Sequence, residues 1–166
     1  MRGSAAPLLR AALALTLLTG CASQKDTVQR ATEGPTADEI YIARFLKGYG
    51  RGPTFDETAA WREDFDKKVS AYISRQPGMV VSPRVSQFRV QRRVAVGMTR
   101  EEVTVLVGAP DAVVSDEKLM EAAARQFWPE VRTHAKEMWN YPAGWQLYFD
   151  GDRLADLTVI GRPPLE

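Results

Sequence analysis

The only cysteine of the chain, Cys21, limits what this sequence can fold into. It follows a basic start and an apolar run, Ala11–Leu18, that is far shorter than the roughly 20 residues needed to span a bilayer. Residues 1–20 are therefore predicted to be an export signal peptide that is removed. With its one cysteine at the first position, the remaining chain cannot hold an internal disulfide and must fold around an apolar core. Its length is sufficient for one domain.

The tetrapeptide Leu18-Thr19-Gly20-Cys21 resembles the bacterial lipobox, in which small residues precede a cysteine whose sulfur receives a diacylglycerol. Cys21 is therefore the predicted lipidation site of a lipoprotein. Two or three palmitate-type acyl chains would hold it stably at a membrane, whereas a single chain binds only marginally. Ala22 and Ser23 follow in place of an aspartate, which by analogy predicts transfer to the outer membrane, on its periplasmic face, with the inner membrane as the alternative.

Polar composition and a Gly-Pro pair predict a flexible tether over residues 21–37, and helical patterns predict a helical region over residues 38–93. A short helix is expected from 38 to 46. A longer one is expected to begin at a capping box, Thr54 with Glu57, and to end near Gln76. A third is expected from about 84 to 92, followed by an extended segment before Gly97.

Residues 94–166 are predicted to form an α+β module, beginning with a short helix whose start and end are both encoded. Thr99 and Glu102 form a second capping box, Gly108 ends the helix, and Pro110 prevents its continuation. A helix of two turns is not stable alone in water, so it must pack on another element.

Three alternating segments predict the sheet of this module: 137–141, 145–149 and 154–160, the last two joined by an Asp150-Gly151 turn. The expected fold class is two-layer α+β, with helices on one face of a three-stranded antiparallel sheet and additional N-terminal helices. An inserted helix is expected at about 117–135, with a break at Trp128 because Pro129 follows.

These motifs resemble the SmpA/OmlA family of BamE-like outer-membrane assembly lipoproteins. The elements that carry the resemblance are the lipobox, a Gly-Met-Thr helix start, a Gly-x-Pro helix end, a Trp-x-Tyr strand and a final hairpin, here Leu18–Cys21, Gly97–Thr99, Gly108–Pro110, Trp139–Tyr141 and residues 145–159. The resemblance covers roughly Val94 to Ile160 and implies this fold, an envelope location and a partner in the β-barrel assembly machinery or another envelope protein. The inserted helix and the N-terminal region depart from the family pattern.

Residues that could support catalysis or bind a metal are scarce in the sequence. His134 is the only histidine, so neither a Cys/His metal set nor a Ser/His/Asp triad stands out. We therefore expect no catalytic residues, no metal, no cofactor, no small-molecule substrate and no enzyme activity. Near-balance of acidic and basic side chains gives no electrostatic case for nucleic acid as a partner.

Protein binding is the function class that remains, because the sequence contains several Trp and Tyr residues and these side chains are enriched at binding hot spots. Alternation places Trp145 with Leu147 and Phe149 on one strand face, which is expected to be mostly core. If the opposite face is open, Tyr148 is the expected exposed aromatic, beside Gln146, with Trp128 as a further candidate contact. The function predicted is a non-catalytic binding or scaffold module in outer-membrane protein assembly or envelope maintenance. Two alternatives stay open: an inhibitor-type module, like the β-lactamase inhibitor proteins, that docks on a periplasmic enzyme, and an anionic-lipid binder that uses Arg89, Arg92 and Arg93.

Overall fold

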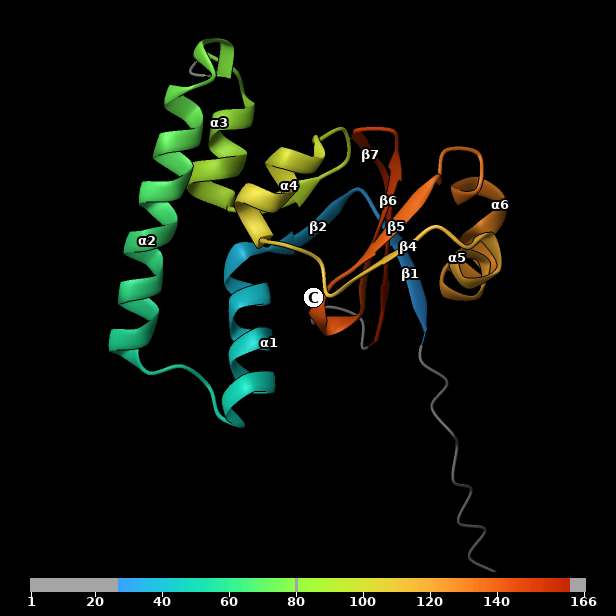
Figure 1. Ribbon diagram of the computed structural model, residues 1–166, viewed down its shortest axis with the longest axis horizontal. Helices are drawn as coiled ribbons and strands as arrows, with labels where there is room; N and C mark the ends of the chain where they lie inside the picture. The colour runs from blue at the N-terminus through green and yellow to red at the C-terminus, as the bar shows by residue number, and fades with distance from the viewer. Residues whose placement is uncertain (1–26, 80, 162–166) are drawn as a thin grey trace, which may run out of the picture.

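The computed structural model describes residues 27–79 and 81–161, and a five-stranded antiparallel sheet with the order β1-β7-β6-β5-β4 lies at its centre (Figure 1). Its strands are β1 (Val28–Ala31), β4 (Ala112–Val114), β5 (Glu137–Asn140), β6 (Trp145–Asp150) and β7 (Arg153–Ile160). A separate antiparallel ribbon consists of β2 (Glu33–Thr36) and β3 (Arg93–Ala95). The predicted α+β class is confirmed, but the prediction of a three-stranded sheet is wrong.

The two extra strands join the edges of the predicted hairpin sheet by pairing over long sequence distances. In β1, Val28 pairs with Ile160 of β7, and in β4, Ala112 pairs with Asn140 of β5. The tether predicted over residues 21–37 is therefore wrong for its second half, which forms β1 and β2. Backbone hydrogen bonds to a neighbouring strand need no apolar pattern, so the polar sequence of β1 gave no signal of its pairing.

The helices and helical turns confirm most of the predicted helix positions. They are α1 (Ala37–Tyr49), α2 (Phe55–Ser74), η1 (Pro77–Met79), α3 (Arg84–Ser86), the π-helical turn η2 (Gln87–Gln91), α4 (Arg100–Val107), α5 (Glu117–Ala124), η3 (Arg125–Phe127), α6 (Trp128–Val131) and η4 (Pro142–Gly144). Both predicted capping boxes are present, at Thr54 and at Thr99. Each supplies acceptors for backbone N–H groups that have no partner inside the helix.

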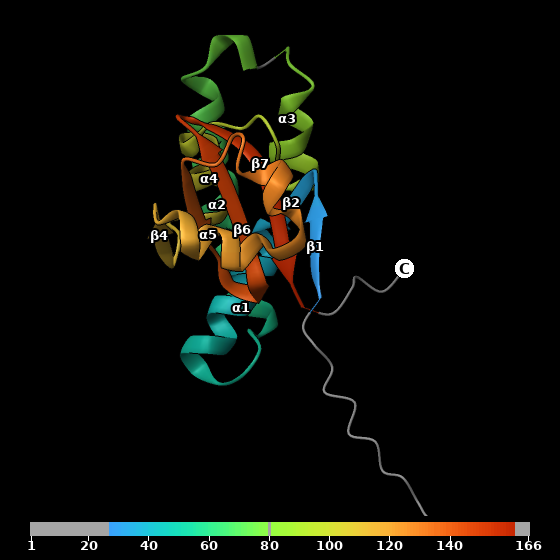
Figure 2. The ribbon, with the colours of Figure 1, turned by 90° about the vertical axis from the view of Figure 1, so that its right-hand side faces the viewer.

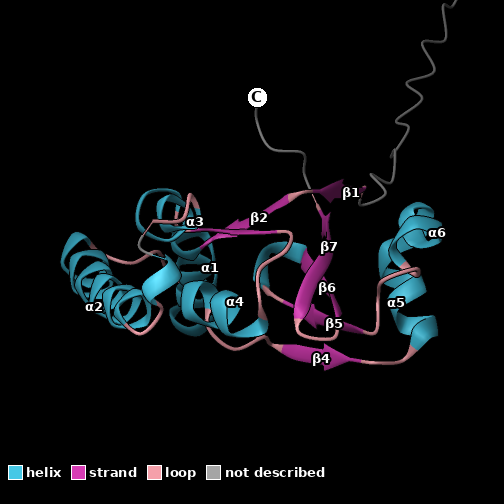
Figure 3. Ribbon diagram, turned by 90° about the horizontal axis from the view of Figure 1, so that it is seen from above, coloured by secondary structure: helices cyan, strands magenta, loops and turns pink. Residues whose placement is uncertain are grey.

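Helices cover both faces of the sheet, so the predicted arrangement with helices on one face is also wrong (Figure 3). α5 and α6 lie against one face. The β2–β3 ribbon, α1 and α4 lie against the other, and α2 lies farther out on that side (Figure 1).

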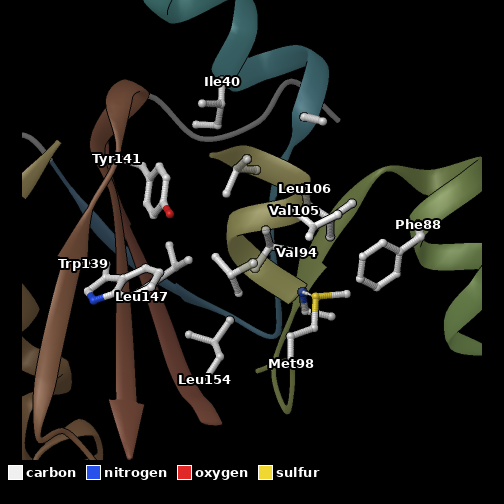
Figure 4. Packing of buried hydrophobic residues seen from close by; sticks show 14 of the residues in the cluster. Ile40, Phe88, Val94, Met98, Val105, Leu106, Trp139, Tyr141, Leu147 and Leu154 are labelled. Carbon is white, nitrogen blue, oxygen red and sulfur yellow. Dashed lines mark hydrogen bonds between the residues drawn. The ribbon is translucent and has the colours of Figure 1, made fainter. Parts of the chain in front are cut away.

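The main core lies between the sheet and α4 (Figure 4). Leu147 and Leu157 are opposite each other on β6 and β7, and their side chains are fully buried with Val103 of α4. The end of α4 is tied down by side chains: the Tyr141 hydroxyl donates to the Gly108 carbonyl over 2.8 Å, and Arg44 donates to the Val107 carbonyl over 2.8 Å. Tertiary packing thus holds a helix that is too short to be stable alone.

The second core lies between the sheet and α5–α6, and it contains a buried polar network. Met138 and Tyr148 are cross-strand partners beneath this layer. The Tyr148 hydroxyl lies 3.1 Å from Thr158 Oγ1, which in turn donates to Gln146 Oε1 over 2.7 Å. Because each polar group has a partner, this face is buried without a desolvation penalty from unpaired groups.

The inserted helical segment breaks earlier than the sequence indicated. Arg125, at the end of α5, has a positive φ of 52°, and the chain resumes a helical course into α6. Pro129 lies in the first turn of α6, where a proline is tolerated because its missing N–H would have no helical partner. The break predicted at Trp128 is therefore wrong, and it lies at Arg125.

Alkaline pH is expected to lower the free energy of unfolding, partly because the buried Tyr148 hydroxyl resists ionisation in the folded protein. Burial raises the pKa of Tyr148 from 10.0 to about 12. The hydroxyl therefore contributes stability that is complete below pH 10 and is lost as pH rises toward 12, because the unfolded chain ionises first. In urea titrations, we expect the free energy of unfolding to fall less over this range in Tyr148→Phe than in wild type. Tyr49→Phe, which removes an exposed hydroxyl, is the control, and an equal fall in Tyr148→Phe and wild type would contradict the assignment.

Candidate binding cleft around Trp145

The structure buries the three side chains that the sequence suggested as partner contacts. Tyr148 is 0% exposed, and Gln146 and Trp128 are each 7% exposed. The prediction is wrong because it assumed an open sheet face, and α5–α6 cover that face. Polar residues alternate with apolar ones in β6 and β7, which suggested that this sheet face is exposed to solvent. In the structure these polar side chains form hydrogen bonds with one another.

The three arginines suggested as lipid contacts do not line one helix face. Arg89 is exposed on η2, but Arg92 has a left-handed φ of 50° and ends the helical turn. Its guanidinium donates to Asp66 over 3.0 Å. Arg93 begins β3 and donates to Glu33 over 3.0 Å. Two of the three charges are thus engaged within the protein, and the predicted basic face does not form.

Cys21 lies outside the described residues. Within residues 27–79 and 81–161, no helix is long and apolar enough to cross a membrane. No cluster of three His, Cys, Asp or Glu side chains in the same ranges could hold a metal ion.

A cleft of about 430 Å³ opens where β1, β2 and the end of β7 meet η4. Trp145, half-buried, lies in it at the start of β6. The apolar part of the lining comes from Ala31, Gly34, Ala143, Trp145, Val159 and Ile160. Because both ends of the described chain contribute strands to it, the cleft exists only in the folded protein.

The turn before Trp145 is fixed by a close approach between backbones. Gly144 has a φ of +80°, and a Cβ built there would lie 2.0 Å from the carbonyl oxygen of Ile160. The preceding residue, Ala143, also has a positive φ, of 59°. On the opposite wall, a Cβ at Gly34 would lie 3.1 Å from Leu157 Cδ2, which lets β2 cross closely over β7. Small residues thus set the distance between the two walls.

The polar groups of the cleft orient its aromatic side chain. Trp145 Nε1 donates to Glu39 Oε1 over 2.8 Å, so the indole is fixed against the first turn of α1. Glu33 and Arg93 form an ion pair at the rim. A fixed, partly exposed Trp is typical of protein-binding hot spots, and a concave apolar surface with a few polar groups at its edge is typical of binding sites in general.

Sequence reasoning placed Trp145 in the core with Leu147 and Phe149, because all three share one face of β6. Leu147 and Phe149 are indeed 0% exposed, whereas Trp145, at the start of the strand, packs against the main core but is only partly buried. A signal was available in the sequence: the Pro-Ala-Gly turn before Trp145 marks the strand end, where burial is incomplete.

A second exposed apolar feature lies where α1 ends and α2 begins, and we call it the α1–α2 tip. Its large apolar side chains and their exposed fractions are Ile42 (43%), Leu46 (48%), Tyr49 (70%) and Phe55 (86%). Behind them, Tyr41 stacks on Trp61 with the ring centroids 4.4 Å apart and connects the two helices.

No protein-family model matches this chain, and neither a curated protein nor a solved structure is significantly similar to it. The resemblance to the SmpA/OmlA family therefore depends on the motifs alone. The structure places those motifs at the main core: Met98, in the Gly-Met-Thr segment, is 0% exposed, and Trp139 lies on β5.

Gly144→Ala is expected to destabilise the protein by about 3 kcal/mol, because the new Cβ collides with the Ile160 backbone and the positive φ disfavours any side chain. The matched control is Gly48→Ala in α1, where a Cβ meets nothing within 4 Å and helix propensity improves by up to about 1 kcal/mol. Urea denaturation of both variants measures the difference. Equal stability of the two variants would show that the turn does not need glycine.

Proposed function

We propose that this chain is a lipid-anchored cell-envelope protein that acts without catalysis, by binding another envelope protein. The anchor would be Cys21, and the site would be the periplasmic face of the outer membrane. Support comes from the lipobox and the export signal in the sequence, together with the motifs shared with the SmpA/OmlA family. Those motifs favour outer-membrane protein assembly or envelope maintenance as the process.

The observation that carries the binding role is the half-buried Trp145 in its cleft. Trp is the side chain most strongly enriched at hot spots, and here its ring is held by Glu39 before any partner arrives. Such preorganisation lowers the entropy cost of association. The apolar part of the lining combines small residues with Trp145, Val159 and Ile160, which suits an extended apolar segment of a partner protein.

Attachment through Cys21 is tested with the substitution Cys21→Ser. We expect the wild-type protein to incorporate labelled palmitate and to fractionate with membranes. The Cys21→Ser protein should incorporate none and should lose that association, since no helix of the described residues could replace the anchor. Palmitate incorporation by the variant at the wild-type level would contradict the assignment of Cys21.

Binding through the cleft is tested by photocrosslinking in intact envelopes. A photoreactive amino acid at Gln29, which lines the cleft, should capture a specific envelope protein identifiable by mass spectrometry. The same group at Glu121, exposed on α5 across the sheet, should not capture it. Recovery of β-barrel assembly components would support the process that the motifs imply.

The matched variant for this experiment is Ala31→Glu, which places a charge against the apolar wall of the cleft. We expect the crosslink from Gln29 to decrease at least about tenfold, because a buried unpaired carboxylate costs well over 1.4 kcal/mol. Circular dichroism checks that the fold is retained. An unchanged crosslink in a folded Ala31→Glu protein would refute the cleft as the docking site.

A further inference from the structure

The α1–α2 tip is an apolar projection with no partner among the described residues. Ile42, Leu46 and Tyr49 follow the i, i+4, i+7 pattern and form one stripe along α1. Phe55 is the first residue of α2 and is the most exposed of the four apolar tip residues, at 86%. Exposed apolar side chains gathered in one place mark an interaction surface, whereas single ones do not.

The tip is suited to insertion because its loop is thin and the charge of Arg51 within it is already paired. Residues 50–53 contain two glycines and a proline, and no atom lies within 4 Å of a Cβ built at Gly50 or Gly52. Arg51 donates to both carboxylate oxygens of Glu57 over 2.8 Å, and its guanidinium lies 5.1 Å from the centre of the Phe45 ring. Phe45 and its neighbour Tyr49 therefore stand beside a paired ion, and the exposed carboxylate next to Phe55 is that of Asp56.

The tip lies at the same end of the molecule as the start of the described chain. In Figure 1 and in Figure 2, which is turned by 90°, α1 descends to the lower end, and β1 begins on the lower side too, level with α1 and above the tip. Cys21 lies six residue steps before Thr27, the first described residue. At about 3.3–3.6 Å per residue they reach no farther than roughly 22 Å. A lipid on Cys21 therefore keeps this end of the protein close to the membrane surface.

We propose that the α1–α2 tip inserts Tyr49, Phe55 and Leu46 into the interfacial layer of the membrane that holds the Cys21 anchor. This inference rests on the proposed anchoring. The occupant is a lipid surface because the side chains project outward from a narrow hairpin, in contrast to the concave Trp145 cleft. Tyr and Phe with neighbouring Lys47 and Arg51 are the combination found at membrane interfaces, where rings enter the headgroup layer and cations remain at its surface.

Insertion at a second point would fix the orientation of the domain. An anchor alone lets the domain rotate about its attachment, whereas two contacts, at Cys21 and at the tip, restrict that rotation. Because Arg51 is paired with Glu57 and Lys47 with Asp111, insertion depends on apolar burial and does not require anionic lipid.

The test uses the lipidated full-length mature protein in vesicles of phosphatidylethanolamine and phosphatidylglycerol. Its only cysteine carries the lipid, so one introduced cysteine gives one labelling site. An environment-sensitive fluorophore is attached at Gly52→Cys in the tip loop or, as control, at Asp152→Cys in the β6–β7 turn at the opposite end (Figure 1). We expect lipids brominated on the acyl chains to quench the label at position 52 at least about twofold and to leave the label at 152 unchanged.

A pair of background variants separates insertion by the tip from insertion by the dye itself. Tyr49→Ser with Phe55→Ser should abolish the quenching at position 52. Val90→Ser removes a 77% exposed apolar side chain on η2, away from the tip, and should preserve it. Quenching that is equal at 52 and 152, or that survives the double substitution, overturns the proposal. A tip covered by a second copy of the chain would show no quenching at 52, which also overturns it. If the protein carries no lipid or does not sediment with vesicles, the proposed anchoring fails; sedimentation without quenching at 52 refutes the tip alone.

Discussion

The antiparallel pairing of β1 with β7 is the constraint on which the rest of this structure depends. It joins the first described residues to the last strand, with Val28 opposite Ile160 and Ala31 opposite Leu157. Immediately after β1 the chain crosses over to form β2, which pairs with β3 on the α4 side. This one pairing therefore places the start of the chain, one wall of the Trp145 cleft and the beginning of α1. An ion pair between Arg30 and the buried Asp156, at 2.7 Å, strengthens it beyond its backbone hydrogen bonds.

The two faces of the sheet are buried by different means, and this difference explains where binding surfaces remain. Toward α4 the core is almost entirely apolar, and it ends where β6 begins, which leaves Trp145 at an open edge. Toward α5–α6 the layer includes the satisfied network of Gln146, Tyr148 and Thr158. All three residues lie on β6 and β7, so the polar groups of this sheet face are satisfied within the sheet and the helices can cover it without leaving one unpaired. The covered face is thus unavailable to a partner.

Much of the local structure could be predicted from the sequence, because its signals act within a few residues. The capping boxes at Thr54 and Thr99, the helix end at Gly108 and the Asp150-Gly151 turn all lie where their chemistry indicated. The candidate site could not be predicted in the same way. Tyr148 was expected at the surface and Trp145 in the core, whereas Tyr148 is fully buried and Trp145 only partly buried, because alternation tells which residues share a face but not which face is covered.

The sequence by itself carried the predicted export and lipidation signals, and it determined the capped starts of α2 and α4 and the central hairpin, since each depends on contacts between near neighbours in the chain. Only the tertiary structure decided the rest. It added β1 and β4 to the sheet, covered its second face, opened the cleft at Trp145 and brought the α1–α2 tip to the end where the chain begins. These features depend on pairing and packing between segments far apart in the sequence, such as Val28 with Ile160, and no local pattern records which distant segment will provide the partner.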